Sequence, residues 1–458
     1  MKKSIKLLSL LLALLLSLTM FAGCKNSNEE EAPVDEEQEE PITLTVGIPV
    51  GSSDEDWADW ESVLTTWVED FETFYNCHLK FTKVPDGSNK KAVKKFMRKV
   101  DSGKIACFFT ERQDFIETMM EDDTILSIPT VQARYTAVME TTPEGIYSIS
   151  EEPSMENYMY PIYGTFQGLY YNRTMFKELG IENPTSWDNL VADIAAIKAK
   201  GITPIAAGFA DVGLEYMVEE MIMSEGGTAE HSYQPSFGVV SSWERAVNDI
   251  KTLEGMGAFT ADCYNVNFET ALQSFLNGEA AMIVAPSTAF NGALADGSSG
   301  IGTGDVKVVG FPKTPTGKRE DGAFVGRIEH GVYFGKNNFN KKDTRYAETV
   351  IELLGNDYFT SGEFYELVAD EESTFCVEPS YYSDYLYEAS HLDSAKSSLV
   401  KNAVAADWTM RERFYTYDTT IASFRKALTG TDLETALLEA TNAEIAAVEA
   451  AAAEKKKD

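Results

Sequence analysis

Residues 168–208 constrain the fold of this chain more than any other stretch. They open with an apolar, aromatic run at 169–171, which is too short for a helix and is typical of a buried strand. Residues 172–180 then predict a helix that ends at a glycine, a second helix follows at once, and residues 202–207 are again strand-like. A strand, two helices and a strand are the unit of a parallel α/β sheet, so an α/β fold is expected.

The second of these helices carries its own start signal and one apolar face. Thr185 is a good N-cap, and Asp188 follows three residues later as a capping-box partner. Gly201 is placed to end the helix. Apolar residues recur between them at helical spacing, which predicts a single buried stripe: Trp187, Leu190, Val191, Ile194 and Ile197.

The same stretch contains two linked motifs. YYNRxxFxxxGI begins at Tyr170, and PxSWxxLxxxxxxIKxKGITPIAxG begins at Pro184. In order and spacing they resemble the extracellular solute-binding proteins of ABC importers, in the carbohydrate-binding group related to maltose-binding protein. Residues 268–285, with a helix, a turn and a strand, and residues 424–440, with two helices around a turn, are similar to that family too.

The resemblance implies an α/β fold of the type II periplasmic-binding-protein class, with two doubly wound α/β lobes joined by a hinge. The chain is expected to cross between the lobes three times, near residues 163–168, 315–326 and 378–385. The implied lobe boundaries are residues 41–165 with 318–378 for the first lobe, and residues 166–317 with 379–458 for the second. Such a protein captures a sugar or oligosaccharide in the interlobe cleft and delivers it to the transmembrane subunits of an ABC permease.

The N-terminus has the pattern of an export signal. Three lysines precede an apolar run at 7–21, and two small residues then lead to Cys24. Residues 1–23 are therefore expected to be a lipoprotein signal peptide, with Cys24 as the lipidated residue. The lipobox usually has leucine three residues before its cysteine, where this chain has phenylalanine, and a plain secretory signal is the alternative. An exported protein anchored by lipid to the outer face of the cytoplasmic membrane is expected, without a membrane span.

The charge and composition of the chain limit the classes of partner that it can bind. Residues 24–40 carry eight acidic side chains and few apolar ones, which predicts a disordered, self-repelling tether. The formal charge of the chain is −34, which argues against a nucleic-acid partner and against adhesion to an anionic membrane. A neutral or cationic ligand is favoured over an anionic one, and a monomeric protein is expected, with the lipid anchor as the only membrane contact.

Cysteine and histidine positions give no sign of a metal site or cofactor. The four histidines form no HExxH motif, and the cysteines after Cys24 form no CxxC motif. Cys77 and Cys107 are expected on strands that flank the first strand of the sheet, so no disulfide should join them. Cys263 and Cys376 are far from both in the sequence. No metal, no cofactor and no catalytic residue are therefore predicted.

A sugar needs flat aromatic surfaces for its C–H faces and polar groups for its hydroxyls. In an open α/β sheet, ligands sit outside the carboxyl ends of the strands, where the first lobe offers Trp57, Glu111 and Arg112. The resemblance adds residues that precede the first crossing and residues at family contact positions in the second lobe. These further candidate ligand-binding residues are Tyr160, Tyr163, Phe166, Asp211, Phe290 and Tyr417.

Two questions about the aromatic candidates and two alternative functions stay open. Many sugar binders carry a tryptophan shortly after the strand at 280–285, where this chain offers only Phe290, and the helical spacing of Tyr417 is also what core packing produces. The same fold with a polyamine or a polyol phosphate as ligand is one alternative. A secreted carbohydrate-active enzyme is the other, and it would need two carboxylates across the cleft, for which Glu111 and Asp211 are the candidates.

Overall fold

The computed structural model describes residues 40–49, 54–111, 114–134, 158–226, 235–290, 301, 305–318, 324–355, 375–376 and 414–455. The chain divides into two units, residues 1–41 and residues 42–458, and the folded body is the second. Cys24, Arg112 and the expected third crossing at 378–385 lie outside the described residues. Among the residues that are described, no helix combines the length and the apolar character that a membrane span requires.

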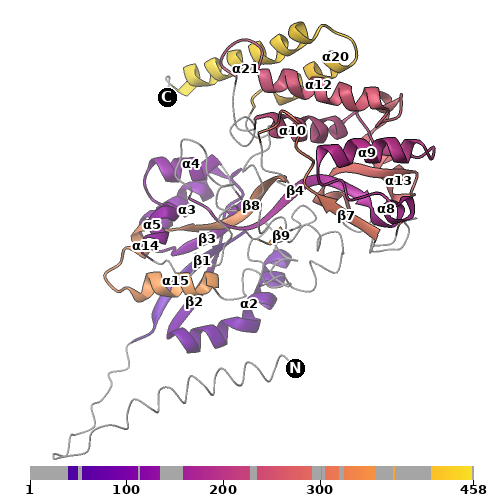
Figure 1. Ribbon diagram of the computed structural model, residues 1–458. Helices are drawn as coiled ribbons and strands as arrows, with labels where there is room; N and C mark the ends of the chain where they lie inside the picture. The colour runs from indigo at the N-terminus through magenta and orange to yellow at the C-terminus, as the bar shows by residue number, and fades with distance from the viewer. Residues whose placement is uncertain are drawn as a thin grey trace, which may run out of the picture. The chain divides into compact units, whose positions relative to one another are not determined.

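The described strands join into one nine-stranded sheet (Figure 1). The strands are β1 (Ile42–Ile48), β2 (Cys77–Lys83), β3 (Cys107–Glu111), β4 (Tyr160–Asn172), β5 (Thr203–Ala206), β6 (Ala280–Pro286), β7 (Val306–Val309), β8 (Val325–Phe334) and β9 (Phe375–Cys376). Their order is β2-β1-β3-β8-β4-β6-β5, and β7 and β9 pair with β4 outside this path. The early strands and the later strands are thus connected through β8 and β4.

Strand direction changes along the sheet. β1 pairs in parallel with β2 and β3, and β5 pairs in parallel with β6. By contrast, β4 runs antiparallel to β6, β7 and β8. The prediction of a parallel unit over residues 168–208 was therefore wrong in one respect. Both of its strands exist, but β6 lies between β4 and β5, so the first strand of the unit is reversed.

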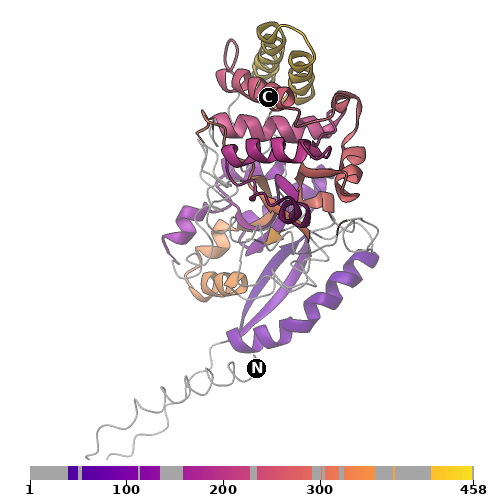
Figure 2. The same ribbon diagram turned by 45° about the vertical axis from the view of Figure 1, so that its right-hand side comes forward.

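Helices account for much of the rest of the described chain. They are α2 (Asp54–Tyr75), α3 (Lys90–Asp101), α4 (Asp114–Glu121), α5 (Ile128–Gln132), α8 (Arg173–Leu179), α9 (Trp187–Lys198), α10 (Val212–Gly226), α12 (Ser241–Met256), α13 (Phe268–Leu276), α14 (Lys336–Phe339), α15 (Arg345–Gly355), α20 (Tyr417–Leu428) and α21 (Leu433–Lys455). Short 3₁₀ turns occur at Cys263–Asn265 (η1) and Ser287–Phe290 (η2). α20 and α21 lie side by side against α12 in both views of the ribbon (Figures 1 and 2).

The buried side chains form three main clusters. One packs α2 and α15 against β1 and β2, around Leu44 and Val46. Another packs α9, α10, α12 and α20 around Trp243, which is fully buried. A third includes Phe108 of β3 and Tyr170 of β4, so it runs beneath both the early and the later strands. Burial of this much apolar surface is the main force that holds the sheet and its helices together.

Local sequence signals set most of the helix ends. The side chain of Asn89 accepts a hydrogen bond from the amide of Ala92 and so caps α3. Gly180 ends α8 with φ of 66°, a left-handed conformation that favours glycine. The predicted cap of α9 was wrong by one residue, because Ser186 and not Thr185 accepts from the amide of Asn189. Serine and threonine are both good caps, so the choice between neighbours depends on the backbone path.

Gly208 marks a close approach between two backbones. A Cβ at this position would lie 2.3 Å from the carbonyl oxygen of Asn267 and 2.7 Å from the Cα of Phe268. Only glycine permits that approach, which brings the loop after β5 against the start of α13. The amides of Phe209 and Ala210 donate to the carbonyls of Cys263 and Val266 in the same region. The loop before α10 is therefore held firmly in place.

The cysteines occupy the predicted strands. Cys77 is opposite Ile42, and Cys107 is opposite Val46, so the two flank β1 on opposite sides. Both are buried free thiols, as is Cys263. Burial raises the pKa of the Cys107 thiol to about 12, which makes it a poor nucleophile. The predicted placement on either side of β1 is confirmed.

β4 and β8 each have a paired strand along both of their edges. β8 pairs through residues 330–334 with β3 and through residues 325–332 with β4. β4 pairs through residues 160–167 with β8 and through residues 167–171 with β6. These two long strands therefore link the early and the later part of the sheet. β4 contains residues 163–168, where the first crossing is predicted, whereas β8 shares only residues 325–326 with the predicted second crossing at 315–326.

Candidate functional site

Two predicted site residues lie at the carboxyl edge of the parallel strands β1, β2 and β3. Glu111 is the last residue of β3. Trp57, on α2, is half-buried, and its ring centroid lies 5.8 Å from the Nζ of Lys83, the last residue of β2. The carboxyl ends of parallel strands meet at one edge, so the fold brings Trp57 and Glu111 to the same edge of the sheet.

A row of directly opposed residues extends from Glu111 across the sheet. Glu111 is opposite His330 of β8, and His330 is opposite Tyr163 of β4, which in turn is opposite Cys376 of β9. Neighbouring strands are about 4.8 Å apart, so the backbones of Glu111 and Tyr163 are about 10 Å apart. For both residues the structure describes the backbone and not the side chain. Two predicted site residues are thereby brought together, with a histidine between them.

His330 was not predicted as a site residue. Its ring stacks on that of Phe109, with 5.9 Å between the ring centroids and 8° between the planes. Phe109 is fully buried, so this stacking fixes the histidine ring against the core. Nothing near His330 in the sequence marks the position. Only the pairing of β8 with β3 and β4 reveals that it lies between Glu111 and Tyr163.

Three aromatic candidates are buried in the core clusters. Tyr160, Phe166 and Phe290 are each exposed by no more than 5 %. The ring of Phe166 packs edge-on against Phe324, and that of Phe290 lies 4.3 Å from Tyr170. These contacts are those of core residues, and any ligand contact by their side chains remains a prediction.

The turn η2 lies beside β4. The amide of Phe166 donates to the Oγ of Ser287, at a distance of 3.2 Å, and Ser287 begins the turn that ends at Phe290. Gln167 is opposite Pro286, the last residue of β6. The carboxyl end of β6 and the first predicted crossing are therefore adjacent.

Asp211 lies on the loop between β5 and α10, as predicted, and is exposed. Its Oδ1 accepts a hydrogen bond of 2.8 Å from the amide of Phe268, the first residue of α13. A carboxylate is favourable there because the first turn of a helix presents unpaired N–H groups. Since β5 and β6 are parallel, Asp211 and η2 both follow carboxyl strand ends at the same edge.

Tyr417 is the first residue of α20 and is buried in the core around Trp243. Its hydroxyl lies 3.5 Å from Glu215 and 3.4 Å from Glu219, both on α10. The residue therefore fastens α20 to α10. A stacking contact between Tyr417 and a ligand is not tested by this geometry.

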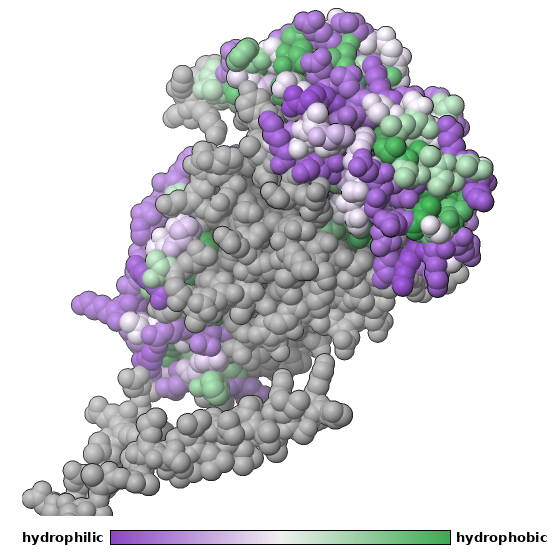
Figure 3. All heavy atoms as spheres, in the orientation of Figure 1, coloured by the Kyte–Doolittle hydropathy of each residue, from purple (hydrophilic) through white to green (hydrophobic). Residues whose placement is uncertain are grey.

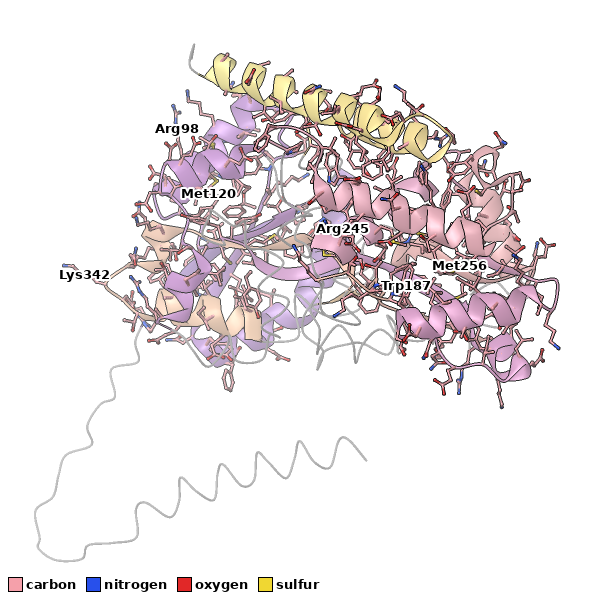
Figure 4. All side chains as sticks on the ribbon, turned by 45° about the horizontal axis from the view of Figure 1, so that its top comes forward. Arg98, Met120, Trp187, Arg245, Met256 and Lys342 are labelled. Atoms are coloured by element: carbon pink, nitrogen blue, oxygen red, sulfur yellow. The ribbon has the colours of Figure 1, made fainter. Side chains whose placement is uncertain are left out.

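A groove of about 640 Å³ lies between α3 and α4, away from all the predicted site residues. Its lining combines the cations Lys90, Lys94 and Arg98 of α3 with the apolar Val93 and Met97. Figure 4 shows Arg98 on α3 and Met120 on the neighbouring α4. In the view of Figure 3 most of the described surface is hydrophilic, as the acidic composition leads one to expect.

Across the ranges that the structure describes, no three His, Cys, Asp or Glu side chains come close enough together to hold a metal ion. Asp211, on the loop after β5, is a hydrogen-bond acceptor. This arrangement can bind a polar solute through hydrogen bonds.

The fold is shared with solved solute receptors. The bacterial solute receptor AcbH is 13 % identical, with a TM-score of 0.64, over 90 % of this chain and 98 % of that chain. A probable secreted solute-binding lipoprotein from Streptomyces coelicolor is 16 % identical, with a TM-score of 0.62, over 88 % of this chain and 99 % of that chain. These similarities show the fold, which is that of type II periplasmic binding proteins.

A curated relative matches a shorter stretch. The multiple sugar-binding protein of Streptococcus mutans serotype c is 40 % identical over 60 residues, which are 13 % of this chain and 14 % of that protein. The match thus spans about a seventh of the relative.

The family model for bacterial extracellular solute-binding proteins matches residues 57–357. That range covers well over half of the chain, from α2 to the end of α15, and includes both motifs that first suggested the resemblance. The chain belongs to the bacterial extracellular solute-binding proteins.

Proposed function

We propose that this protein is the substrate-binding subunit of an ABC importer, and that it captures a sugar or oligosaccharide and delivers it to the permease. The observation that carries the proposal is the match of residues 57–357 to the extracellular solute-binding family. Support for a sugar comes from the local 40 % identity to a multiple sugar-binding protein. The paired motifs from Tyr170 onward also resemble the carbohydrate-binding group of the family.

The ligand site is proposed between two lobes, residues 41–165 with 318–378 and residues 166–317 with 379–458. In support of this division, β4 and β8 each pair with strands of both parts. A pair of adjacent strands that passes from one lobe to the other can bend as a hinge. Closure would then complete the site.

The proposed ligand contacts come from both parts of the sheet. Trp57 and Glu111 belong to the first part, and Arg112 directly follows Glu111 in the sequence. Tyr163 lies on the linking strand β4, and Asp211 follows β5 in the second part. An aromatic ring would cover a C–H face of the sugar, while carboxylates would accept hydrogen bonds from its hydroxyls.

Binding without catalysis is proposed. Glycoside hydrolysis requires one carboxylic acid poised to protonate the leaving oxygen and a second carboxylate at a fixed distance. Asp211 instead uses its Oδ1 to accept a hydrogen bond from the amide of Phe268, a structural contact at the start of α13. Incubation with a reporter glycoside should therefore give stoichiometric binding and no turnover.

Export and a lipid anchor complete the proposal. Members of this family are extracellular, and residues 1–23 have the pattern of a lipoprotein signal that ends before Cys24. The lipid would hold the protein at the outer face of the cytoplasmic membrane. The acidic residues 25–40 would act as a tether to the folded body.

The test is a thermal-shift screen of the mature protein against a panel of mono- and oligosaccharides, followed by calorimetry on each hit. A ligand that binds only the folded state raises the midpoint by mass action. At a concentration 100 times its Kd, a sugar should contribute about 2.7 kcal/mol. Polyamines and polyol phosphates serve as comparison ligands. A shift with one of these and with no sugar would refute the carbohydrate assignment while leaving the family unchanged.

A further inference from the structure

A buried carboxylate lies near the end of α10. Glu225 is fully buried, and its two carboxylate oxygens accept hydrogen bonds from three side chains. The Nε of Arg245 on α12 donates to Oε2 at 2.6 Å, and the hydroxyls of Thr314 and Thr316 donate to the same carboxylate. Figure 4 shows Arg245 on α12. The position of Glu225 is thus fixed from two directions, by a helix and by the loop after β7.

A second carboxyl group, that of Asp249, lies beside Glu225, and its Oδ2 is buried without a hydrogen-bond donor from the described residues. Asp249 lies one helical turn after Arg245, so the two side chains share a face of α12. Burial, a hydrogen bond to Glu225 and the charge of Glu225 raise the pKa of Asp249 to about 7, although Arg245 opposes the shift. Burial alone would raise the pKa of Glu225, but hydrogen bonds from Thr314, Arg245, Asp249 and Thr316 lower it. Asp249 is therefore the member of the pair that holds the proton.

This cluster fastens the segment that leads into β8. The amide of Thr314 donates to the Oγ of Ser224 at 2.8 Å, and the amide of Lys318 donates to the carbonyl of Ser224 at 2.8 Å. One residue earlier on α10, Met223 packs against Val325, the first residue of β8, and both are fully buried. The start of a linking strand is thus attached to α10 beside the carboxyl pair.

We propose that Glu225 and Asp249 form a proton-operated latch that holds residues 313–318, and with them the start of β8, against α10 and α12. While Asp249 is protonated, its carboxyl donates to the Glu225 carboxylate and the cluster carries one negative charge against the one positive charge of Arg245. When Asp249 loses its proton, a half-buried and a fully buried carboxylate lie side by side, and Arg245 neutralises only one of them. The repulsion weakens the contacts of Glu225 with Thr314 and Thr316, and the segment is released.

The charged groups that act on Asp249 lie on two helices, α10 and α12. Glu225 faces it from α10 and Arg245 from its own helix, while the loop contributes only the uncharged hydroxyls of Thr314 and Thr316. α20 and α21 also pack against α12, but among the described residues the charges that act on Asp249 are those of Glu225 and Arg245. The proton on Asp249 is therefore the variable that sets the net charge of the latch.

Hydrogen exchange of the ligand-free mature protein tests the latch, so its outcome is independent of the proposed function. The measured quantity is the exchange of the Thr314, Gly317 and Lys318 amides, corrected at each pH for the intrinsic rate. The equilibrium constant for opening of residues 313–318 should increase by up to about tenfold per pH unit between pH 5 and pH 7 and level off above pH 7. The reason is that the open form binds fewer protons than the closed form. In Asp249→Asn, which stays neutral and can still donate, this increase should disappear.

The matched control is Glu244→Gln, an exposed carboxylate on the same helix, which should behave as the unmodified protein. Asp249→Ala removes the donor and should expose the segment at every pH. The latch is refuted if the corrected exchange of the unmodified protein does not change between pH 5 and pH 7. It is equally refuted if Asp249→Asn keeps the same pH dependence.

Discussion

The hydroxyl of Tyr417 lies 3.4 Å from the Oε1 of Glu219, across the contact between α20 and α10. Tyr417 was predicted to stack on a ligand, and its ring is buried in a core cluster. The contact with Glu219 assigns the side chain at least one structural role, because a buried hydroxyl needs a hydrogen-bond partner.

Tyr417→Ala is expected to lower the free energy of unfolding by about 3–5 kcal/mol, because it removes a buried ring. Tyr417→Phe keeps the ring and loses only the hydroxyl contacts, so a loss of about 1 kcal/mol is expected. Urea denaturation measures both. Calorimetry with a sugar that binds then tests stacking, which predicts that Tyr417→Phe retains affinity and that folded Tyr417→Ala loses it. Equal affinity in both variants would restrict Tyr417 to the core.

Gly208 and Gly255 form a matched pair for a stability test. Gly208→Ala would place a methyl group 2.3 Å from the Asn267 carbonyl, and a loss of more than about 2 kcal/mol is expected. Gly255 lies near the end of α12 with nothing within 4 Å of the added atom, so Gly255→Ala should gain about 0.4–1 kcal/mol. Thermal denaturation should shift in opposite directions for the two variants. A neutral Gly208→Ala would contradict the close approach of the two backbones.

The buried carboxyl group of Asp193 should make the free energy of unfolding depend on pH. It is 3 % exposed on α9, and burial, with a smaller contribution from the charge of Glu182, raises its pKa to about 6. Because the folded pKa is above that of the unfolded chain, the contribution of Asp193 is fully present below about pH 4. It is lost as the pH rises to about 6. Asp193→Asn should therefore stabilise the protein at pH 7 by on the order of 2 kcal/mol and have little effect at pH 4.

The control for this experiment is Asp188→Asn, an exposed acid in the first turn of the same helix. Its carboxylate is favourable at a helix N-terminus, so its replacement should lose a few tenths of a kcal/mol at pH 7. Denaturation curves at pH 4 and pH 7 distinguish the two sites. A gain at pH 4 equal to that at pH 7 would show that Asp193 acts through packing and not through its charge.

Much of the early part of the sheet was predictable from local sequence. Residues 42–48 predict a first strand with the bounds that β1 has, and the helix predicted over residues 89–101 is α3, which begins one residue later, at Lys90. Bounds were less accurate where the boundary signal is weak. The sequence predicts the first helix from about residue 60 to residue 75, whereas α2 begins at Asp54. It predicts the second strand at residues 79–84, whereas β2 is Cys77–Lys83. Both elements exist as predicted, and only their bounds differ.

The sheet order and the candidate site could not be predicted in the same way. Strand pairing between distant segments leaves no periodicity in either one, so the reversed direction of β4 and the position of His330 opposite Glu111 are invisible in the sequence. Burial of Phe166 and Phe290 could not be separated from ligand contact either, because an aromatic residue at a strand end serves both purposes. The family resemblance supplied the fold class, and neither it nor the local patterns supplied these strand pairings.

Lobe closure should be measurable in solution. A ligand that contacts both lobes favours the closed state, so the radius of gyration from X-ray scattering should fall when a binding sugar is saturating. Spin labels on Lys95 of α3 and Glu269 of α13, one in each proposed lobe and both exposed, should move relative to each other. Labels on Lys91 and Lys95, both on α3, are the control and should keep their distance. An unchanged radius at proven saturation would contradict a hinged site.

Anchoring through Cys24 is tested by Cys24→Ser. Without the thiol no lipid can be attached, so the protein should move from the membrane fraction to the soluble fraction while its sugar affinity stays the same. Fractionation followed by immunoblotting measures the distribution. Retention of the serine variant on the membrane would contradict the lipid anchor and would point to a different means of attachment.

The position of β8 between β3 and β4 has a consequence for biosynthesis. Phe108 of β3 is opposite Tyr333 of β8, a residue that a ribosome adds about 225 residues later. At about 5–20 residues per second that interval is roughly 10–45 s, during which one edge of β3 has no partner. An unpaired apolar strand edge is a template for aggregation. The nascent chain should therefore need protection from a chaperone until β8 is available, and any truncation before residue 334 should leave an insoluble product.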